Sequence, residues 1–127
     1  MSIKKRSVLV IEDCEFVREM MQYVLEESGM QVVTADDGEQ GLKLAALDVP
    51  DFIVMDWMMP KLTGHEVLDR LKKDPRTRDI PVIVVSARTL EQNMMNDIQH
   101  FHSFIPKDEE TLFRLVDELQ QFQAVVA

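Results

Sequence analysis

Five short, largely apolar runs recur along the chain, and this recurrence limits the folds that it can adopt. Each run is four to six residues long, a length typical of strands that are buried on both faces of a sheet. The runs are Val8–Ile11, Gln31–Ala35, Phe52–Met55, Pro81–Val85 and Phe101–Pro106. Turn residues and helical patterns separate them, so we expect five distinct strands.

Segments with a helical spacing of apolar residues follow each of these runs. The clearest is Cys14–Ser28, whose apolar stripe consists of Phe16, Val17, Met20, Met21, Val24 and Leu25. The other predicted helices are Glu39–Leu47, His65–Lys73, Leu90–Gln99 and Glu109–Phe122. This alternation predicts an α/β fold, in which helices cover both faces of a doubly wound, five-stranded parallel sheet.

Length and charge narrow the possible functions. The 127 residues fit one domain, with residues 1–6 and 123–127 expected to be frayed ends. A net charge of −9 argues against binding nucleic acid or an anionic membrane surface. No apolar run reaches transmembrane length, and the single cysteine, Cys14, excludes an internal disulfide. We therefore expect a cytoplasmic protein.

Polar residues follow four of the five predicted strands. Glu12 and Asp13 come after the first, Asp56 after the third, Ser86 after the fourth and Lys107 after the fifth. Because the carboxyl ends of parallel strands share one edge of a sheet, we expect these side chains to converge. Neighbouring carboxylates raise one another's pKa values, and a divalent cation such as Mg²⁺ removes that conflict. With a lysine and a hydroxyl, the set fits phosphoryl transfer to an aspartate nucleophile.

Simpler structural interpretations exist for these residues. Asp13 could cap the helix that follows it, and Asp56 could cap the next helix or turn. The three histidines, His65, His100 and His102, lack an evident further ligand, so we expect no histidine metal site. The absence of a Gly-rich phosphate loop argues against a nucleotide site.

The chain resembles the receiver domains of response regulators, the CheY-like phosphoacceptors of two-component signalling, from about Ser7 to Phe122. The resemblance lies in Glu12-Asp13, Asp56-Trp57-Met58-Met59-Pro60 with Gly64, Ser86-Ala87, and Lys107 with Phe104 three positions before it. It implies a flavodoxin-like (βα)5 fold, which is a three-layer sandwich.

The resemblance also implies a role for each site residue. Asp56 would accept a phosphoryl group from a sensor histidine kinase or a histidine phosphotransfer protein. Mg²⁺ would be bound directly by Asp13 and Asp56, by the backbone carbonyl of Met58, and through water by Glu12. Lys107 would neutralise one phosphoryl oxygen.

A switch between two states is the further implication of the resemblance. Ser86 would hydrogen-bond another phosphoryl oxygen, and Phe104 would rotate inwards in response. An output protein would bind the last two helices and the strand between them, a surface that includes Met94, Met95 and Phe101. We expect a monomer or weak dimer with no enzymatic activity beyond self-phosphotransfer and autodephosphorylation.

Several features depart from the pattern of the family. Asp108 rather than proline follows the site lysine, so we expect a trans peptide bond there. The small Gly-Ala pair expected before the fifth strand is replaced by His100-Phe101, and these bulky residues lie on the expected output surface. Met58 and Arg88 flank the expected route of the attacking water, and we expect both to alter autodephosphorylation.

Two other functions remain open at this point. A pseudo-receiver would bind partners without being phosphorylated, although the complete set of site residues argues against it. A phosphohydrolase with an aspartate nucleophile would usually keep a second aspartate two positions later, where Met58 stands. The sequence identifies neither the kinase nor the output partner.

Overall fold

The computed structural model describes residues 5–87 and 100–126, in which five strands alternate with four helices. The elements are β1 (Ser7–Ile11), α1 (Glu15–Glu27), β2 (Gln31–Ala35), α2 (Gly38–Leu47), β3 (Phe52–Asp56), α3 (Gly64–Lys73), β4 (Val82–Ser86), β5 (Ser103–Pro106) and α5 (Thr111–Val126). The predicted helix over 90–99, with Met94 and Met95, lies outside the described residues.

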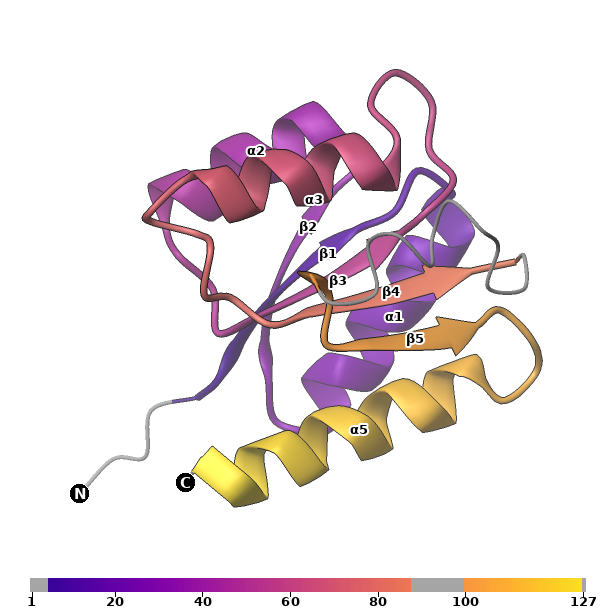
Figure 1. Ribbon diagram of the computed structural model, residues 1–127. Helices are drawn as coiled ribbons and strands as arrows, with labels where there is room; N and C mark the ends of the chain where they lie inside the picture. The colour runs from indigo at the N-terminus through magenta and orange to yellow at the C-terminus, as the bar shows by residue number, and fades with distance from the viewer. Residues whose placement is uncertain (1–4, 88–99, 127) are drawn as a thin grey trace.

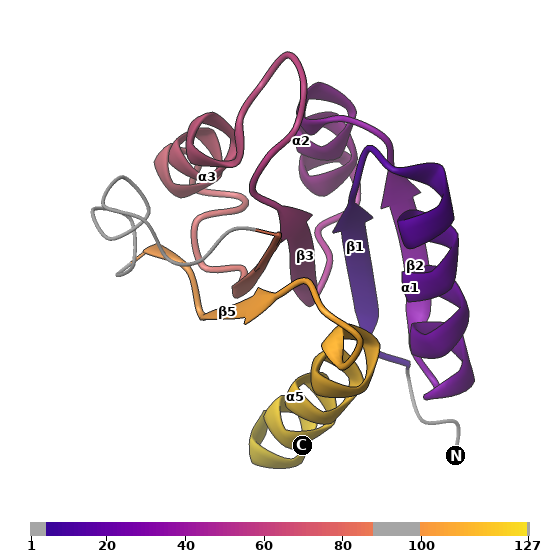
Figure 2. The ribbon, with the colours of Figure 1, turned by 90° about the vertical axis from the view of Figure 1, so that its right-hand side faces the viewer.

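All five strands are parallel and form one sheet in the order β2-β1-β3-β4-β5. Figure 1 shows α2 and α3 on one face of this sheet and α1 and α5 on the other. The prediction of a doubly wound, flavodoxin-like three-layer sandwich is therefore confirmed. β2 and β5 form the two edges of the sheet, as a view turned by 90° shows (Figure 2).

The core has two parts, one on each face of the sheet. Along β1, Val8 and Val10 pack on the side of α1 and α5, whereas Leu9 and Ile11 pack on the side of α2 and α3. Both sets are buried, and this explains why the sequence from Val8 to Ile11 is continuously apolar rather than alternating. Every residue of β3 and β4 is also buried.

The boundaries of the last strand and helix differ from the prediction. β5 begins at Ser103, and Phe101 precedes it as a buried side chain of the α2 and α3 face. α5 begins at Thr111 rather than Glu109 and continues to Val126, past the predicted end at Phe122. The later start has a local cause, because the N–H of Glu110 donates to Asp108 Oδ1 at 2.8 Å and holds residues 108–110 in a turn. The described residues contain no cis peptide bond.

None of the helices in the described ranges combines the length and the apolar character that crossing a membrane would require.

Candidate functional site

The polar residues at the strand ends meet where the direction of winding changes. β1 and β3 are neighbours in the sheet, but the chain leaves β1 for α1 on one face and leaves β3 for α3 on the other. Such a point opens a crevice beyond the carboxyl ends of the strands, where α/β sheets bind ligands. Glu12 and Asp13 enter it from β1, and Asp56 enters it from β3.

Three carboxylates come together in this crevice. Glu12, Asp13 and Asp56 each contribute one oxygen to a group whose members lie within 4.8 Å of one another. Glu12 is only 1% exposed and Asp56 only 5%, whereas Asp13 is open to solvent. Oxygen donors of this kind suit a hard divalent cation such as Mg²⁺. Among residues 5–87 and 100–126 it is the only such group of three or more potential metal ligands.

Lys107, which directly follows β5, contacts the two buried acids at this edge of the sheet. Its Nζ lies 3.0 Å from Glu12 Oε2 and 3.2 Å from Asp56 Oδ2, and it donates a hydrogen bond to Glu12 Oε1 at 3.2 Å. The backbone fixes the start of this side chain, because the N–H of Lys107 donates to the Ser86 carbonyl at 2.7 Å. Glu12 Oε2 has no hydrogen bond from the described residues, so this buried oxygen depends on its ionic contact with Lys107.

Burial and the neighbouring charges alter the ionisation of the site. Burial, followed by the negative charge of Glu12, raises the pKa of Asp56 from 3.8 to about 7, although Lys107 opposes this rise. Burial alone would lower the pKa of Lys107. Its hydrogen bond to Glu12 and the charge of Asp56 outweigh that effect and raise its pKa. The lysine therefore stays charged, while the proton of Asp56 is bound and released near neutral pH.

Glu12 is held by contacts on both its side chain and its backbone. Its Oε1 accepts a hydrogen bond from the N–H of Cys14 at 3.2 Å, and its carbonyl accepts one from Arg18 Nη1 at 2.9 Å. The sequence analysis did not identify Arg18 as part of the site. Its position in the first turns of the predicted helix was the available signal, because a long basic side chain there can reach the preceding loop. The expectation that Asp13 caps this helix was wrong, because Cys14 is the N-cap residue and no side chain caps the helix there.

Asp56 is fixed by the loop that follows it. Its Oδ1 accepts a hydrogen bond from the N–H of Met58 at 3.2 Å, which confirms the simpler expectation of a turn at this residue. Its other oxygen faces Lys107, so the turn and the ionic contact coexist. Trp57, the next residue, is buried, with an exposed fraction of 3%. Gly64 lies so close that a Cβ there would be 2.8 Å from the Trp57 Cα, which explains the glycine.

The remaining predicted residues surround this centre. Ser86 ends β4 and is fully buried, and Phe104 on β5 is partly buried against the α2 and α3 side of the core. The Met58 side chain is 47% exposed, whereas Arg88 lies outside the described residues. Phe101 packs on Trp57 with ring centroids 6.1 Å apart, so this departure from the family pattern fills core volume.

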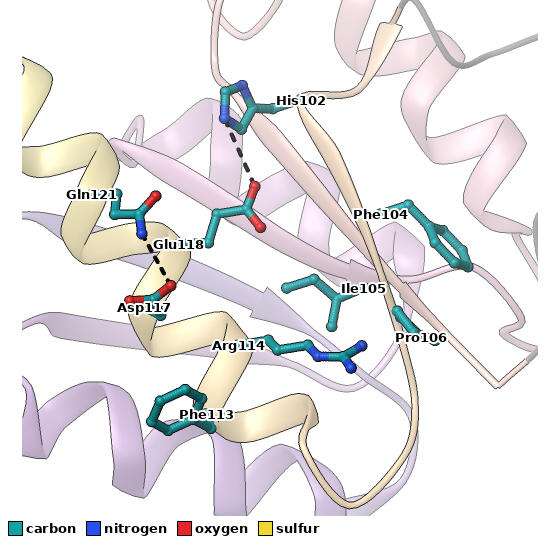
Figure 3. Close-up of a pocket in the computed structure, with 9 residues that line it drawn as sticks. All are labelled: His102, Phe104, Ile105, Pro106, Phe113, Arg114, Asp117, Glu118 and Gln121. Atoms are coloured by element: carbon teal, nitrogen blue, oxygen red, sulfur yellow. Dashed lines mark hydrogen bonds and ion pairs between the residues drawn. The ribbon is translucent and has the colours of Figure 1, made fainter.

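The histidines do not form a site with the acids. His100 and His102 both precede β5, although the predicted strand Phe101–Pro106 included His102. His102 Nε2 lies 3.9 Å from Glu118 Oε1, at the rim of a hollow of about 520 Å³ between β5 and α5 (Figure 3). Ile105 and Phe113 line the same hollow, which places an apolar surface next to charged groups on the outer side of β5.

Comparisons with known proteins agree with this arrangement. Residues 8–119 match the family model described as the response regulator receiver domain. The chain is 37% identical over 94 residues to the phosphate regulon transcriptional regulatory protein PhoB of Escherichia coli, a match that covers 74% of this chain and 41% of PhoB. The chain thus spans about two fifths of that relative.

Two solved structures show the same fold along most of both chains. The N-terminal domain of a Wolinella succinogenes protein is 35% identical and superposes with a TM-score of 0.85, covering 94% of this chain and 95% of its own. The phosphorylated cyanobacterial phytochrome response regulator RcpA is 27% identical with a TM-score of 0.82, covering 98% of this chain and 97% of its own.

Proposed function

The chain belongs to the response regulator receiver family, and we propose that its Asp56 accepts a phosphoryl group from a phosphohistidine. The donor is a sensor histidine kinase or a histidine phosphotransfer protein. One observation carries this proposal: Lys107 contacts both buried acids, so a fixed cation lies beside the Asp56 oxygen that would receive the phosphoryl group. The similarity of the chain to the structure of RcpA, which is phosphorylated, also supports the proposal.

The reaction is a displacement at phosphorus. An oxygen of the Asp56 carboxylate forms a bond to phosphorus while the phosphorus–nitrogen bond of the donor breaks, and the imidazole leaves with the electron pair. The carboxylate must be ionised to attack, and the contact with Lys107 favours that form. In the product Lys107 pairs with a phosphoryl oxygen instead of a carboxylate oxygen, so its charge stays compensated throughout.

Mg²⁺ fits the acidic group, because all three ligands are carboxylates and one buried oxygen of Glu12 lacks a hydrogen bond. Asp13 and Asp56 would bind the ion directly, together with the Met58 carbonyl, and Glu12 would act through water. When bound, the ion neutralises charge that develops on the transferring phosphoryl group. The exposure of Asp13 leaves this side of the crevice open to solvent.

The signal would pass from the site to β5. Ser86 donates a hydrogen bond from its hydroxyl to a second phosphoryl oxygen, and Phe104 rotates inwards in response. Both residues lie on adjacent strands, since Ser86 pairs with Pro106 and Val84 with Phe104 in the register of β4 and β5. The output protein binds the surface formed by β5, α5 and the segment 90–99, and the hollow of Figure 3 lies within it.

With these roles, the protein is a switch whose only chemistry is its own phosphorylation and dephosphorylation. We propose that it works in the cytoplasm. Because the chain spans only part of PhoB, any output domain and its target remain open. Two alternatives make different predictions. A pseudo-receiver would bind partners without being phosphorylated, and a phosphohydrolase would release phosphate continuously.

Incubation with acetyl phosphate and Mg²⁺ separates the three functions. The intact mass of the protein and the release of inorganic phosphate are measured together. A single phosphoryl adduct with phosphate release limited by its slow decay supports the receiver function. Fast turnover without an adduct indicates the phosphohydrolase, and neither adduct nor release, with Mg²⁺ bound and the fold intact, indicates the pseudo-receiver.

A further inference from the structure

The side chain of Lys107 is held through its backbone as well as by the two acids. It lies in the loop 107–110, between β5 and α5. Lysine carries its charge at the end of a flexible four-carbon stem, so the place of its Nζ depends on how firmly the main chain around it is fixed. The N–H of Lys107 donates to the Ser86 carbonyl, and this contact fixes the amino side of the residue. The carboxyl side is held from α5.

Thr111, the first residue of α5, contacts the main chain on both sides of Lys107. It is buried, with an exposed fraction of 6%. Thr111 Oγ1 accepts a hydrogen bond from the N–H of Asp108 at 2.7 Å. The same atom lies 2.8 Å from the Pro106 carbonyl oxygen and 2.9 Å from that of Asp108, and the hydroxyl proton can be donated to either. One buried hydroxyl thus ties the residue before Lys107 to the residue after it.

The contact with Thr111 depends on the departure from the family pattern at position 108. A proline after the site lysine would carry no N–H and could not donate to Thr111. Asp108 supplies that N–H, and its side chain holds the same turn by accepting from the N–H of Glu110 at 2.8 Å. Replacing the hydroxyl by a methyl group would deprive the Asp108 N–H and the Pro106 carbonyl of this contact, which is costly for buried polar groups.

We propose that Thr111 is a positioning residue for phosphoryl transfer, because its hydroxyl fixes the loop that places Lys107 Nζ beside the two buried acids. Its hydrogen bonds are to main-chain groups, so it acts on the reaction through Lys107. This role rests on the proposed function, in which Nζ pairs with a phosphoryl oxygen on Asp56. A displacement of the charge by about 1 Å is enough to slow a reaction that depends on orientation.

Three substitutions of Thr111 test the hydroxyl. Thr111→Val keeps the shape of the side chain, Thr111→Ala avoids placing an extra methyl group beside polar atoms, and Thr111→Ser keeps the hydroxyl. Phosphorylation by acetyl phosphate and Mg²⁺, followed by intact mass over time, should slow by about tenfold in the first two and by less than about twofold in Thr111→Ser. Thr63→Val is the matched control. Thr63 caps α3 by accepting from the N–H of Glu66, and its replacement should leave the rate unchanged.

Combination with Lys107→Met distinguishes positioning from a general structural role. A residue that acts only through Lys107 has nothing left to position once the charge is gone, so Thr111→Val should slow Lys107→Met further by less than about twofold. A general loss of structure would instead slow both backgrounds by the same factor. The proposal is overturned by equal slowing in the two backgrounds, or if Thr111→Val and Thr111→Ala react like the parent.

Hydrogen exchange reads the loop without phosphorylation and so separates this role from the proposed function. The Lys107 amide should exchange about tenfold faster in Thr111→Val and Thr111→Ala than in the parent. The Trp57 amide, which donates to the Val85 carbonyl at 3.1 Å, should exchange at the same rate in all three proteins. Failure of the parent to be phosphorylated, with this difference present, would refute the proposed function but not the contact of Thr111 with the loop. Unchanged exchange of the Lys107 amide overturns the role of Thr111 even where the parent is phosphorylated.

Discussion

Two buried regions of the molecule are stabilised in different ways. One is the polar site at the carboxyl ends of β1 and β3, and the other is the segment that precedes β5. At the strand ends, Glu12, Asp56 and Lys107 balance one another by charge. Before β5, Phe101 packs on Trp57 and fills volume without any ionic contact. The first region should therefore respond to pH and cations, and the second to changes in side-chain volume. The comparison predicts that changes of charge at the first region and changes of side-chain volume at the second have separable effects.

Removal of the fixed cation should have the largest effect. Lys107→Met leaves a side chain of similar length but no charge beside Asp56, so phosphorylation by acetyl phosphate should slow by about 100-fold or more. Intact mass recorded over time gives the rate. Lys73→Met removes an exposed lysine that pairs with Asp69 on α3 and should leave the rate unchanged. A Lys107→Met rate near that of the parent would mean that the charge balance is structural only.

Truncation of Phe101 should affect stability rather than chemistry. Phe101→Ala leaves a cavity against Trp57 and should lower the free energy of unfolding by about 3 kcal/mol. Urea denaturation measures this loss, and His100→Ala, a change at the exposed neighbouring residue, is the control. The comparison breaks down if phosphorylation of the folded Phe101→Ala protein slows as much as that of Lys107→Met.

The raised pKa of Asp56 predicts how stability depends on pH in the absence of Mg²⁺. The unfolded carboxyl loses its proton near 3.8, whereas the folded one keeps it until about pH 7. The unfolded state thus binds fewer protons between these values, and stability falls as the pH rises through this range. Asp56→Asn removes the titrating group and should be more stable than the parent by about 1–2 kcal/mol at pH 8. Denaturation at pH 4 is the control, where the two proteins should differ little.

The smallest expected effect concerns the lifetime of the phosphoryl group. Met58 is exposed next to Asp56, and an asparagine there could hydrogen-bond the attacking water. Met58→Asn should shorten the lifetime by about two- to fivefold, a change of less than about 1 kcal/mol. Arg88→Glu tests the second position, which lies outside the described residues. Equal rates of phosphate loss in both variants and the parent would refute these roles.

The fold and the acidic site were predictable because they depend on local patterns. Largely apolar runs identified the strands, and the polar residues after four of these runs identified the shared edge. Contacts between distant segments had no such signal. The hydrogen bond from Arg18 to the Glu12 carbonyl and the burial of Phe101 against Trp57 depend on how the helices and loops pack in three dimensions. Periodicity also gave no warning that Asp108 delays the start of α5.

The most direct measurement is the position of the phosphoryl group itself. The protein is incubated with acetyl phosphate and Mg²⁺, the acyl phosphate is reduced with borohydride, and the modified residue is found by mass spectrometry of peptides. We predict that the modification occurs at Asp56 and that Asp56→Asn carries none. Modification of Glu12 or Asp13 instead, or an equal yield in Asp56→Asn, would contradict the proposed phosphoacceptor.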